Sequence, residues 1–347
     1  MTKFIQFISS LMIILISAPQ IGATEQSNTA HPTMAVLELN RAVVLDYHES
    51  QHPNIWLAYN YFDQGMDYLN YAKKTGTSTK ITQWTSFSGG FNINIDEDFR
   101  LRLSLEAGDQ TLTRPTEPKN LNPKYWGGDI RIQWKTRFNA LSNFALEAGY
   151  QKHNSPAYSV SQYQQGALLI SSPPGQSLFD SSSNDHAWLL GGIASFRPTS
   201  SLTLHTNLEY RAVKVQTTTT SYDPLIAAVL KAQQIPQATP WKEQHIIAGA
   251  GLDWTFLSKG LLSMDIKQYT ISRKNYQPRT GFADYNQNTV FDAYLSYALN
   301  NNFVLYTHGQ AASHFVLGEL PLLYNRRNNH TFKNPFGFLS VGMQYRM

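Results

Sequence analysis

FGFLSVGMQYRM, residues 336–347, alternates apolar and polar side chains with a period of two. One set of alternate residues comprises Leu339, Val341, Met343, Tyr345 and Met347, and the other comprises Phe338, Ser340, Gly342, Gln344 and Arg346. Successive side chains of a β-strand point to opposite faces of the sheet. The segment therefore predicts a strand with one continuously apolar face.

The same period returns in eleven further segments. Residues 124–138 show it clearly, because five consecutive side chains on one face are polar or charged and cannot occupy a dry core. These five are Asp129, Arg131, Gln133, Lys135 and Arg137. The twelve predicted strands are 54–62, 81–95, 99–109, 124–138, 143–151, 186–196, 201–212, 245–256, 261–273, 290–299, 303–312 and 336–347.

The connections between these strands alternate strictly in length. Short ones span 96–98, 139–142, 197–200, 257–260 and 300–302, and long ones span 63–80, 110–123, 152–185, 213–244, 274–289 and 313–335. Short turns on one side, long loops on the other and an even strand count are typical of a transmembrane β-barrel. We therefore predict an all-β fold, an antiparallel up-and-down transmembrane barrel of twelve strands. The alternative is a secreted soluble β-sandwich or solenoid.

Aromatic residues near the strand ends match the interfacial girdles of such barrels. They are Trp126, Trp134, Phe138, Tyr150, Phe196, Trp254 and Phe256. The mean hydropathy of the 347-residue chain, −0.34, is too polar for a bundle of membrane helices. Crossing by strands therefore fits the composition better than crossing by helices.

The long apolar run Phe4–Ser17 follows Lys3 and precedes a stretch of small residues. This pattern predicts a secretory signal peptide, cleaved after Ala23. The chain contains no cysteine, which excludes disulfides, thiolate metal sites, a cysteine nucleophile and a lipoprotein anchor. A formal net charge of +4 argues against a protein that binds nucleic acid.

The chain resembles the Gram-negative class of outer-membrane β-barrels in its signal peptide, its twelve alternating segments and its final strand LSVGMQYRM. In that class the final strand carries an aromatic residue third from its end and another at the terminus. Tyr345 matches the first, and Met347 replaces the second. The resemblance implies a signal peptide over 1–23, a periplasmic segment over 24–53 and an outer-membrane barrel over 54–347.

The resemblance also implies an orientation and a set of partners. Short turns are expected in the periplasm and long loops outside the cell. The outer face is expected to contact outer-membrane lipid and lipopolysaccharide, and the barrel-assembly machinery is expected to recognise the C-terminal strand.

Two segments outside the predicted strands carry patterns of their own. Met34–Tyr47 is apolar enough to pair with the barrel or plug it, or it is a flexible leader with a short strand. In the loop 213–244, Asp223 is predicted to cap a helix over 224–234, which either folds inward as a constriction or packs as a lid over the rim. We expect this loop and the loop 152–185 to act as a gate or as surface-recognition elements.

If the apolar faces meet lipid, the polar faces line the barrel interior. The predicted pore-lining residues are Arg100, Arg102, Glu106, Asp129, Arg131, Lys135, Arg137, Glu147, Glu209, Arg211, Asp253, Asp265, Lys267, Asp292 and Arg346. Basic and acidic groups nearly balance. The interior is therefore either a weakly selective aqueous channel or a network of ion pairs that narrows the pore.

Five cations fall on two adjacent predicted strands: Arg100, Arg102, Arg131, Lys135 and Arg137. Such a ladder favours anionic solutes, since rings of arginine and lysine line anion pathways. The alternative is that Glu106, Asp129 and Glu147 pair with these cations.

Two short patterns match catalytic motifs by their letters. Ser313 and His314 adjoin a strand end near His308, but no nucleophile-elbow glycine pattern surrounds the serine. The segment His48–His52 has HExxH spacing, yet Pro53 would end a helix at its second histidine. We expect no catalytic residue, metal or other cofactor, and predict a porin-like passive channel for small solutes that favours anions. The alternatives are a barrel enzyme acting on envelope lipids and a non-conducting structural or adhesion barrel.

Overall fold

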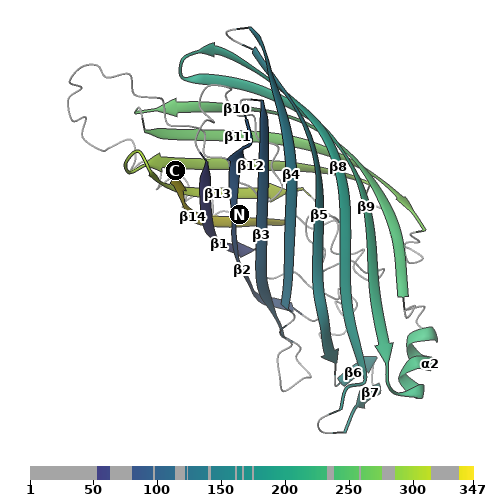
Figure 1. Ribbon diagram of the computed structural model, residues 1–347. Helices are drawn as coiled ribbons and strands as arrows, with labels where there is room; N and C mark the ends of the chain where they lie inside the picture. Colours follow the sequence, from purple (N-terminus) through teal and green to yellow (C-terminus); the bar gives the residue numbers. More distant parts are fainter. Residues whose placement is uncertain are drawn as a thin grey trace. The chain divides into compact units, whose positions relative to one another are not determined.

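The computed structural model describes residues 53–62, 80–96, 98–113, 122, 124–139, 142–160, 162–165, 168–173, 176–232, 238–257, 259–275, 286–313 and 336–347. Within these residues twelve strands form one closed antiparallel barrel (Figure 1). They are β1 (Asn54–Phe62), β2 (Lys80–Asn94), β3 (Phe99–Thr113), β4 (Lys124–Asn139), β5 (Ser142–Val160), β8 (Phe179–Thr199), β9 (Leu202–Ser221), β10 (Ala238–Phe256), β11 (Gly260–Lys274), β12 (Gln287–Ala298), β13 (Phe303–Ala312) and β14 (Phe336–Arg346). The predicted fold class is confirmed. Residues 1–52, predicted as signal peptide and periplasmic segment, lie outside the described residues.

The barrel strands follow chain order around the ring. Strand β5 is followed by β8, because β6 (Gln162–Gln165) and β7 (Leu168–Ser171) form a separate two-stranded sheet. Strand β1 closes the ring against β14, in a register that places Asn54 opposite Arg346. Closure removes the exposed sheet edge. A bilayer requires this closure, because unpaired backbone groups at an edge find no partner in hydrocarbon.

The two faces of the wall have opposite chemistry. Buried and exposed residues alternate without exception along β1. Large apolar side chains point outward, for example Leu57 at 63% exposed, Phe87 at 69% and Trp188 at 64%. Apolar surface of this extent is unfavourable in water and favourable in hydrocarbon, so the outer face fits a lipid bilayer. The described part of the chain contains no helix long and apolar enough to span a membrane.

Tight turns join the strands at one end of the barrel, which we call the turn end. In the turn between β2 and β3, Asp96 Oδ1 accepts hydrogen bonds from the backbone N of Asp98 at 2.8 Å and of Phe99 at 2.7 Å. Asn300 makes the same pair of bonds in the turn before β13. Side-chain bonds of this kind fix tight reversals of the chain.

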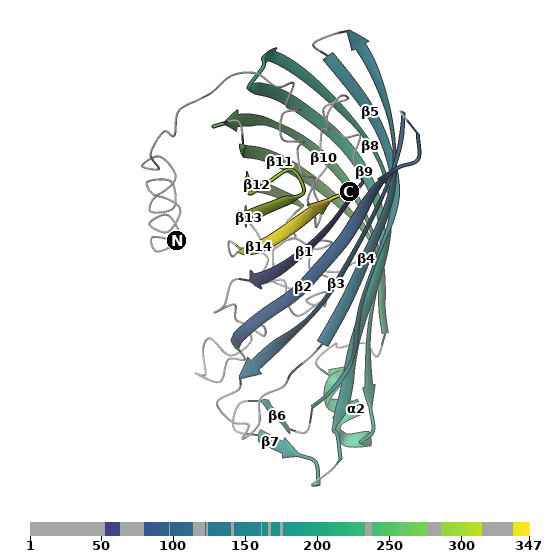
Figure 2. The ribbon, with the colours of Figure 1, turned by 60° about the vertical axis from the view of Figure 1, so that its left-hand side comes forward.

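The opposite end, which we call the loop end, differs from the prediction. Strands β5, β8, β9 and β10 have 19, 21, 20 and 19 residues and extend well into the loops predicted over 152–185 and 213–244. Those two loop assignments are therefore wrong for much of their length. Figure 2 shows β6, β7 and α2 (Pro224–Ala232) near the tips of these long strands. The period of two continues into the extensions, but their serine, threonine and asparagine residues blur the apolar–polar contrast on which the prediction depended.

The predicted helix is confirmed as α2. Asp223 caps it, because its Oδ1 accepts hydrogen bonds from the backbone N of Leu225 at 2.7 Å and of Ile226 at 3.2 Å. Proline suits the first helical position, which needs no N–H donor. Helix α2 contacts β9 and lies at its loop end (Figure 1). This position agrees with a place at the rim.

Tyr306 spans the strands next to the point of closure. Its buried ring lies over Gly342 of β14, and its hydroxyl donates to the backbone O of Leu57 on β1 at 3.2 Å. A Cβ atom at position 342 would meet both the phenol ring and the Leu57 carbonyl. The close approach of the ring therefore requires glycine at this position.

Replacing Gly342 with alanine is expected to destabilise the barrel by about 1–3 kcal/mol, because the added methyl group overpacks the contact with Tyr306. The measurement is the urea midpoint of the refolded protein, followed by heat-modifiable gel mobility. Gly192→Ala on β8 is the matched control, since its Cβ would lie at least 3.7 Å from every neighbouring side chain of the described residues. Equal shifts in both variants would contradict the assignment.

Candidate functional site: the charged barrel interior

The inner face of the wall carries the residues predicted to line a pore. Glu106 and Arg346 are half-buried, and the side chain of Arg137 lies outside the described residues. The remaining ones are buried: Arg100, Arg102, Asp129, Arg131, Lys135, Glu147, Glu209, Arg211, Asp253, Asp265, Lys267 and Asp292. They point inward because each shares a strand with outward neighbours at the alternate positions. Their role in lining a pore stays a prediction.

Arg131 on β4 lies at the centre of an ion-pair network. Its Nε is 2.9 Å from Asp129 Oδ2 on the same strand. Its Nη1 is 2.7 Å from Glu147 Oε1 on β5 and 3.4 Å from Glu209 Oε2 on β9. Since β8 separates β5 from β9 in the ring, this one guanidinium ties together a wide section of the inner wall.

Two further arginines extend the network. Arg102 Nη1 lies 3.5 Å from Glu147 Oε2, and Arg211 forms an ion pair with Glu209 on its own strand. Glu147 and Glu209 therefore each contact two cations, whereas the ion pair of Asp129 is with Arg131. For Arg102 and Arg131, the geometry supports pairing with carboxylates over a ladder of uncompensated cations.

Arg100 differs from both. It is 1% exposed, and its Nε and Nη1 have no hydrogen-bond partner within the described chain. Arg102 on the same strand and Lys135 on β4 are buried on the same face, and the charge of Arg100 interacts with both. We call Arg100, Arg102 and Lys135 the turn-end cation cluster. A buried guanidinium with unmet donors is well suited to a carboxylate, phosphate or other oxyanion.

His205 on β9 lies between two carboxylates. Its Nδ1 is 3.1 Å from Asp253 Oδ2 on β10, and its Nε2 is 2.5 Å from Asp265 Oδ1 on β11. All three side chains are buried. The arrangement fixes the imidazole between the strands and gives the middle of the inner wall a second cross-link.

Asp292 on β12 is the centre of a third group. Its carboxylate lies 3.2 Å from Lys267 Nζ and 3.1 Å from His308 Nε2, and it accepts a hydrogen bond from Gln310 Nε2 at 2.9 Å. These contacts link β11, β12 and β13. They engage His308 in a structural hydrogen bond.

Ser313 has partners other than His308. Its Oγ donates to Asn288 Oδ1 at 3.0 Å and accepts from the backbone N of Thr289 at 3.0 Å. The structure therefore does not bring Ser313 and His308 together as nucleophile and base. His314 and the segment 48–52 lie outside the described residues. Among those that are described, no group of three or more potential ligands is placed to hold a metal ion.

The carboxylate of Glu106 accepts hydrogen bonds from neutral donors. The sequence analysis had considered it as a counter-charge for the cations. Its Oε1 accepts from Ser86 Oγ at 2.6 Å and from the Tyr125 hydroxyl at 2.9 Å. Tyr125 in turn accepts from Trp84 Nε1 at 3.1 Å, and Phe62 stacks on Trp84 with ring centroids 4.6 Å apart. The pairing alternative is therefore wrong for Glu106.

The sequence analysis missed a charged group toward the loop end. Glu243 on β10 forms an ion pair with Arg273 Nε at 2.9 Å and a hydrogen bond with His245 Nε2 at 2.7 Å. His153 Nδ1 on β5 lies 2.9 Å from Asp185 Oδ1 on β8. Both Glu243 and Asp185 belong to strand extensions that the sequence had assigned to loops. Both faces of positions 241–247 mix polar and apolar residues, so no alternation in the sequence marked Glu243.

The inner face also becomes apolar toward the loop end of β9–β13. The buried inward residues there include Val213, Val215, Ile247, Tyr269, Ile271 and Val290. On β9 the outward neighbours of Val213 and Val215 include Lys214 and Gln216, which are polar and exposed. Assigning every apolar face to lipid is therefore wrong for the extension of β9, where the apolar residues point inward and the polar ones outward.

No family model and no curated protein matches this chain. Among solved structures, the translocator domain of the autotransporter NalP from Neisseria meningitidis is similar, with a TM-score of 0.53 at 11% identity over 86% of this chain and 90% of that one. The NanC porin gives 0.45 at 9% over 84% and 100%, and the KdgM porin gives 0.38 at 12% over 84% and 99%. The fold is that of the outer-membrane β-barrels. At these identities the likeness extends to the fold alone.

Proposed function

We propose that this protein is an outer-membrane barrel that forms a narrow passive channel for small hydrophilic solutes and favours anions. The turn-end cation cluster carries this proposal, because its three cations are buried on the inner face and one of them, Arg100, keeps two donors unmet within the described residues, whereas Arg102 pairs with Glu147. Fixed cations on an inner wall raise the local concentration of anions and lower the barrier to their passage. The network around Arg131 narrows the path and limits the size of the solute.

The proposed location is the outer membrane, with the turn end in the periplasm and the loop end outside the cell. The apolar outer face and the tight turns at one end support this orientation. Export through a cleaved signal peptide and recognition of β14 by the barrel-assembly machinery are part of the same proposal. The alternating pattern of β14, with Tyr345 third from the end of the chain, supports recognition by that machinery.

Single-channel recording of the refolded mature protein in a planar bilayer tests the channel. We expect reproducible conductance steps and, in a salt gradient, a reversal potential of the sign that indicates preference for anions. Heat-modifiable gel mobility verifies that the protein added to the bilayer is folded. A folded barrel that passes no current would overturn the channel proposal.

A non-conducting structural barrel is the second candidate. The Arg131 network favours it, because one fully buried guanidinium contacts carboxylates on β4, β5 and β9. The apolar packing of the inner face toward the loop end also favours a non-conducting barrel. The recording described above separates the two candidates, since this one passes no ions.

A further inference from the structure

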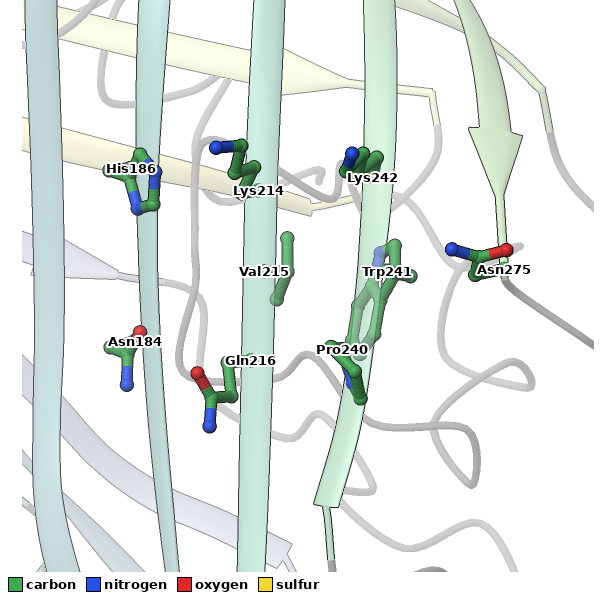
Figure 3. Close-up of a pocket in the computed structure, with 9 residues that line it drawn as sticks. All are labelled: Asn184, His186, Lys214, Val215, Gln216, Pro240, Trp241, Lys242 and Asn275. Atoms are coloured by element: carbon green, nitrogen blue, oxygen red, sulfur yellow. The ribbon is translucent and has the colours of Figure 1, made fainter.

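Five basic side chains stand in a row on the outer surface of the barrel, toward the loop end. The register places Lys152 of β5 opposite His186 of β8, and continues through Lys214 of β9 and Lys242 of β10 to Lys274 of β11. All five lie on the outward face; the four lysines are exposed and His186 is half-buried. Figure 3 shows His186, Lys214 and Lys242 at one level on adjacent strands. We call the five residues the outer basic row.

The described part of the chain offers this row no acidic partner. Side chains directly opposite each other in an antiparallel pair have Cβ atoms about 4.5–5.5 Å apart, and like charges there are destabilising. Among the described residues, no carboxylate forms an ion pair with Lys152, Lys214, Lys242 or Lys274. Since the described residues supply no counter-charge, a row of this length is suited to an anionic ligand.

The row marks a boundary on the outer surface. On its turn-end side lie Tyr150 and Trp188, with ring centroids 4.9 Å apart, and then Leu190, which is 61% exposed. On its loop-end side the outward neighbours are Asn184 and Gln216. Aromatic residues followed by polar ones are typical of the level at which acyl chains give way to headgroups.

The inner face changes at the same level. Arg211 points inward on β9, but the next two inward residues, Val213 and Val215, are apolar and buried, and so is Trp241 on β10. On β9 the wall beyond the row is thus polar outside, at Gln216, and apolar inside, at Val215, whereas Asp185 and Glu243 keep the inner face of β8 and β10 charged near this level. The row therefore lies at the water-facing edge of the membrane belt.

A shallow depression lies in the middle of the row (Figure 3). Its polar lining comprises His186, Lys214 and Lys242 with the amides of Asn184, Gln216 and Asn275, and Val215, Pro240 and Trp241 complete it. Ammonium, imidazole and amide groups all donate hydrogen bonds to oxyanions, and no carboxylate lines the depression.

We propose that the outer basic row binds the phosphate groups of a phosphorylated glycolipid in the outer leaflet, whose acyl chains lie against Trp188 and Leu190. With neighbouring strands about 4.8 Å apart, five strands span roughly 20 Å. This is wider than one phosphate, so the row fits a headgroup that carries more than one. The proposal depends on the orientation of the barrel and not on whether the barrel conducts.

Titration with two lipids tests the proposal on the refolded mature protein in an uncharged detergent. The probes are bisphosphorylated lipid A and the same lipid with both phosphates removed, and binding is read by native mass spectrometry. The phosphorylated lipid is expected to bind about tenfold more tightly or better. The variant Lys214→Gln/Lys242→Gln is expected to lose that advantage and to keep its weak binding of the other lipid.

The matched control is Lys231→Gln/Lys259→Gln, which removes two exposed lysines from α2 and from a tight turn. It makes the same change in net charge and is expected to bind lipid like the unaltered protein.

Equal affinity for the two lipids overturns the proposal, as does full affinity in the Lys214→Gln/Lys242→Gln variant. Complete displacement of the lipid by millimolar inorganic phosphate overturns the assignment to a lipid. A salt series on the unaltered protein gives a second readout, because screening must weaken binding of the phosphorylated lipid alone.

Discussion

Arg131→Met is expected to lower the free energy of unfolding of the barrel by about 3–5 kcal/mol, because it leaves buried carboxylates without their cation. The three carboxylates that contact Arg131 are affected unequally. Glu147 keeps Arg102 and Glu209 keeps Arg211, but Asp129 loses the partner of its ion pair. The measurement is the urea midpoint of the refolded protein, converted to free energy with the slope of the unperturbed transition.

A second substitution separates charge from packing. Adding Asp129→Asn removes the carboxylate that Arg131→Met isolates, so the double variant is expected to recover a substantial part of the lost stability. Lys231→Met removes an exposed cation from α2 and is expected to leave the midpoint unchanged. A midpoint for Arg131→Met equal to that of the unaltered protein would mean that the network adds nothing to stability.

The position of each strand within the membrane belt was predictable from the sequence. Lipid imposes an apolar residue at every outward position there, so the phase of the alternation assigns Arg131 and Glu147 to the inner face before any coordinate is known. The cap of α2 was predictable for a similar reason. Asp223 and Pro224 act through bonds to their immediate neighbours in the chain.

The pairing of charges was not predictable. Arg131 and Glu209 are separated by 78 positions and by the intervening strands β5 and β8, and only the stagger of the closed ring brings them together. The strand extensions were missed because the rule of apolar residues outside ends where the membrane ends. At Val213 and Lys214 the alternation continues, but the apolar residue now points inward and the polar residue outward. A prediction that requires apolar residues on the outer face therefore ends the strand there.

Arg100→Met is expected to change stability in the opposite direction to Arg131→Met, although both remove a buried guanidinium from the inner face. Arg131 donates to carboxylates on three strands, whereas Arg100 has two buried donors without a partner in the described chain. Removing unmet donors removes a desolvation penalty, so the urea midpoint is expected to stay constant or to rise. A fall comparable to that of Arg131→Met would show that Arg100 has a structural role.

The same substitution tests selectivity. A residue that lowers stability at a functional site is retained for what it binds, and a buried cation at the turn end binds anions. The permeability ratio of chloride to potassium, read from reversal potentials in a salt gradient, is therefore expected to fall by roughly half or more in Arg100→Met. Arg100→Lys keeps the charge and is expected to keep most of the ratio. If both variants conduct with the ratio of the unaltered channel, the turn-end cation cluster does not select ions, and the anion preference must be sought elsewhere on the inner wall.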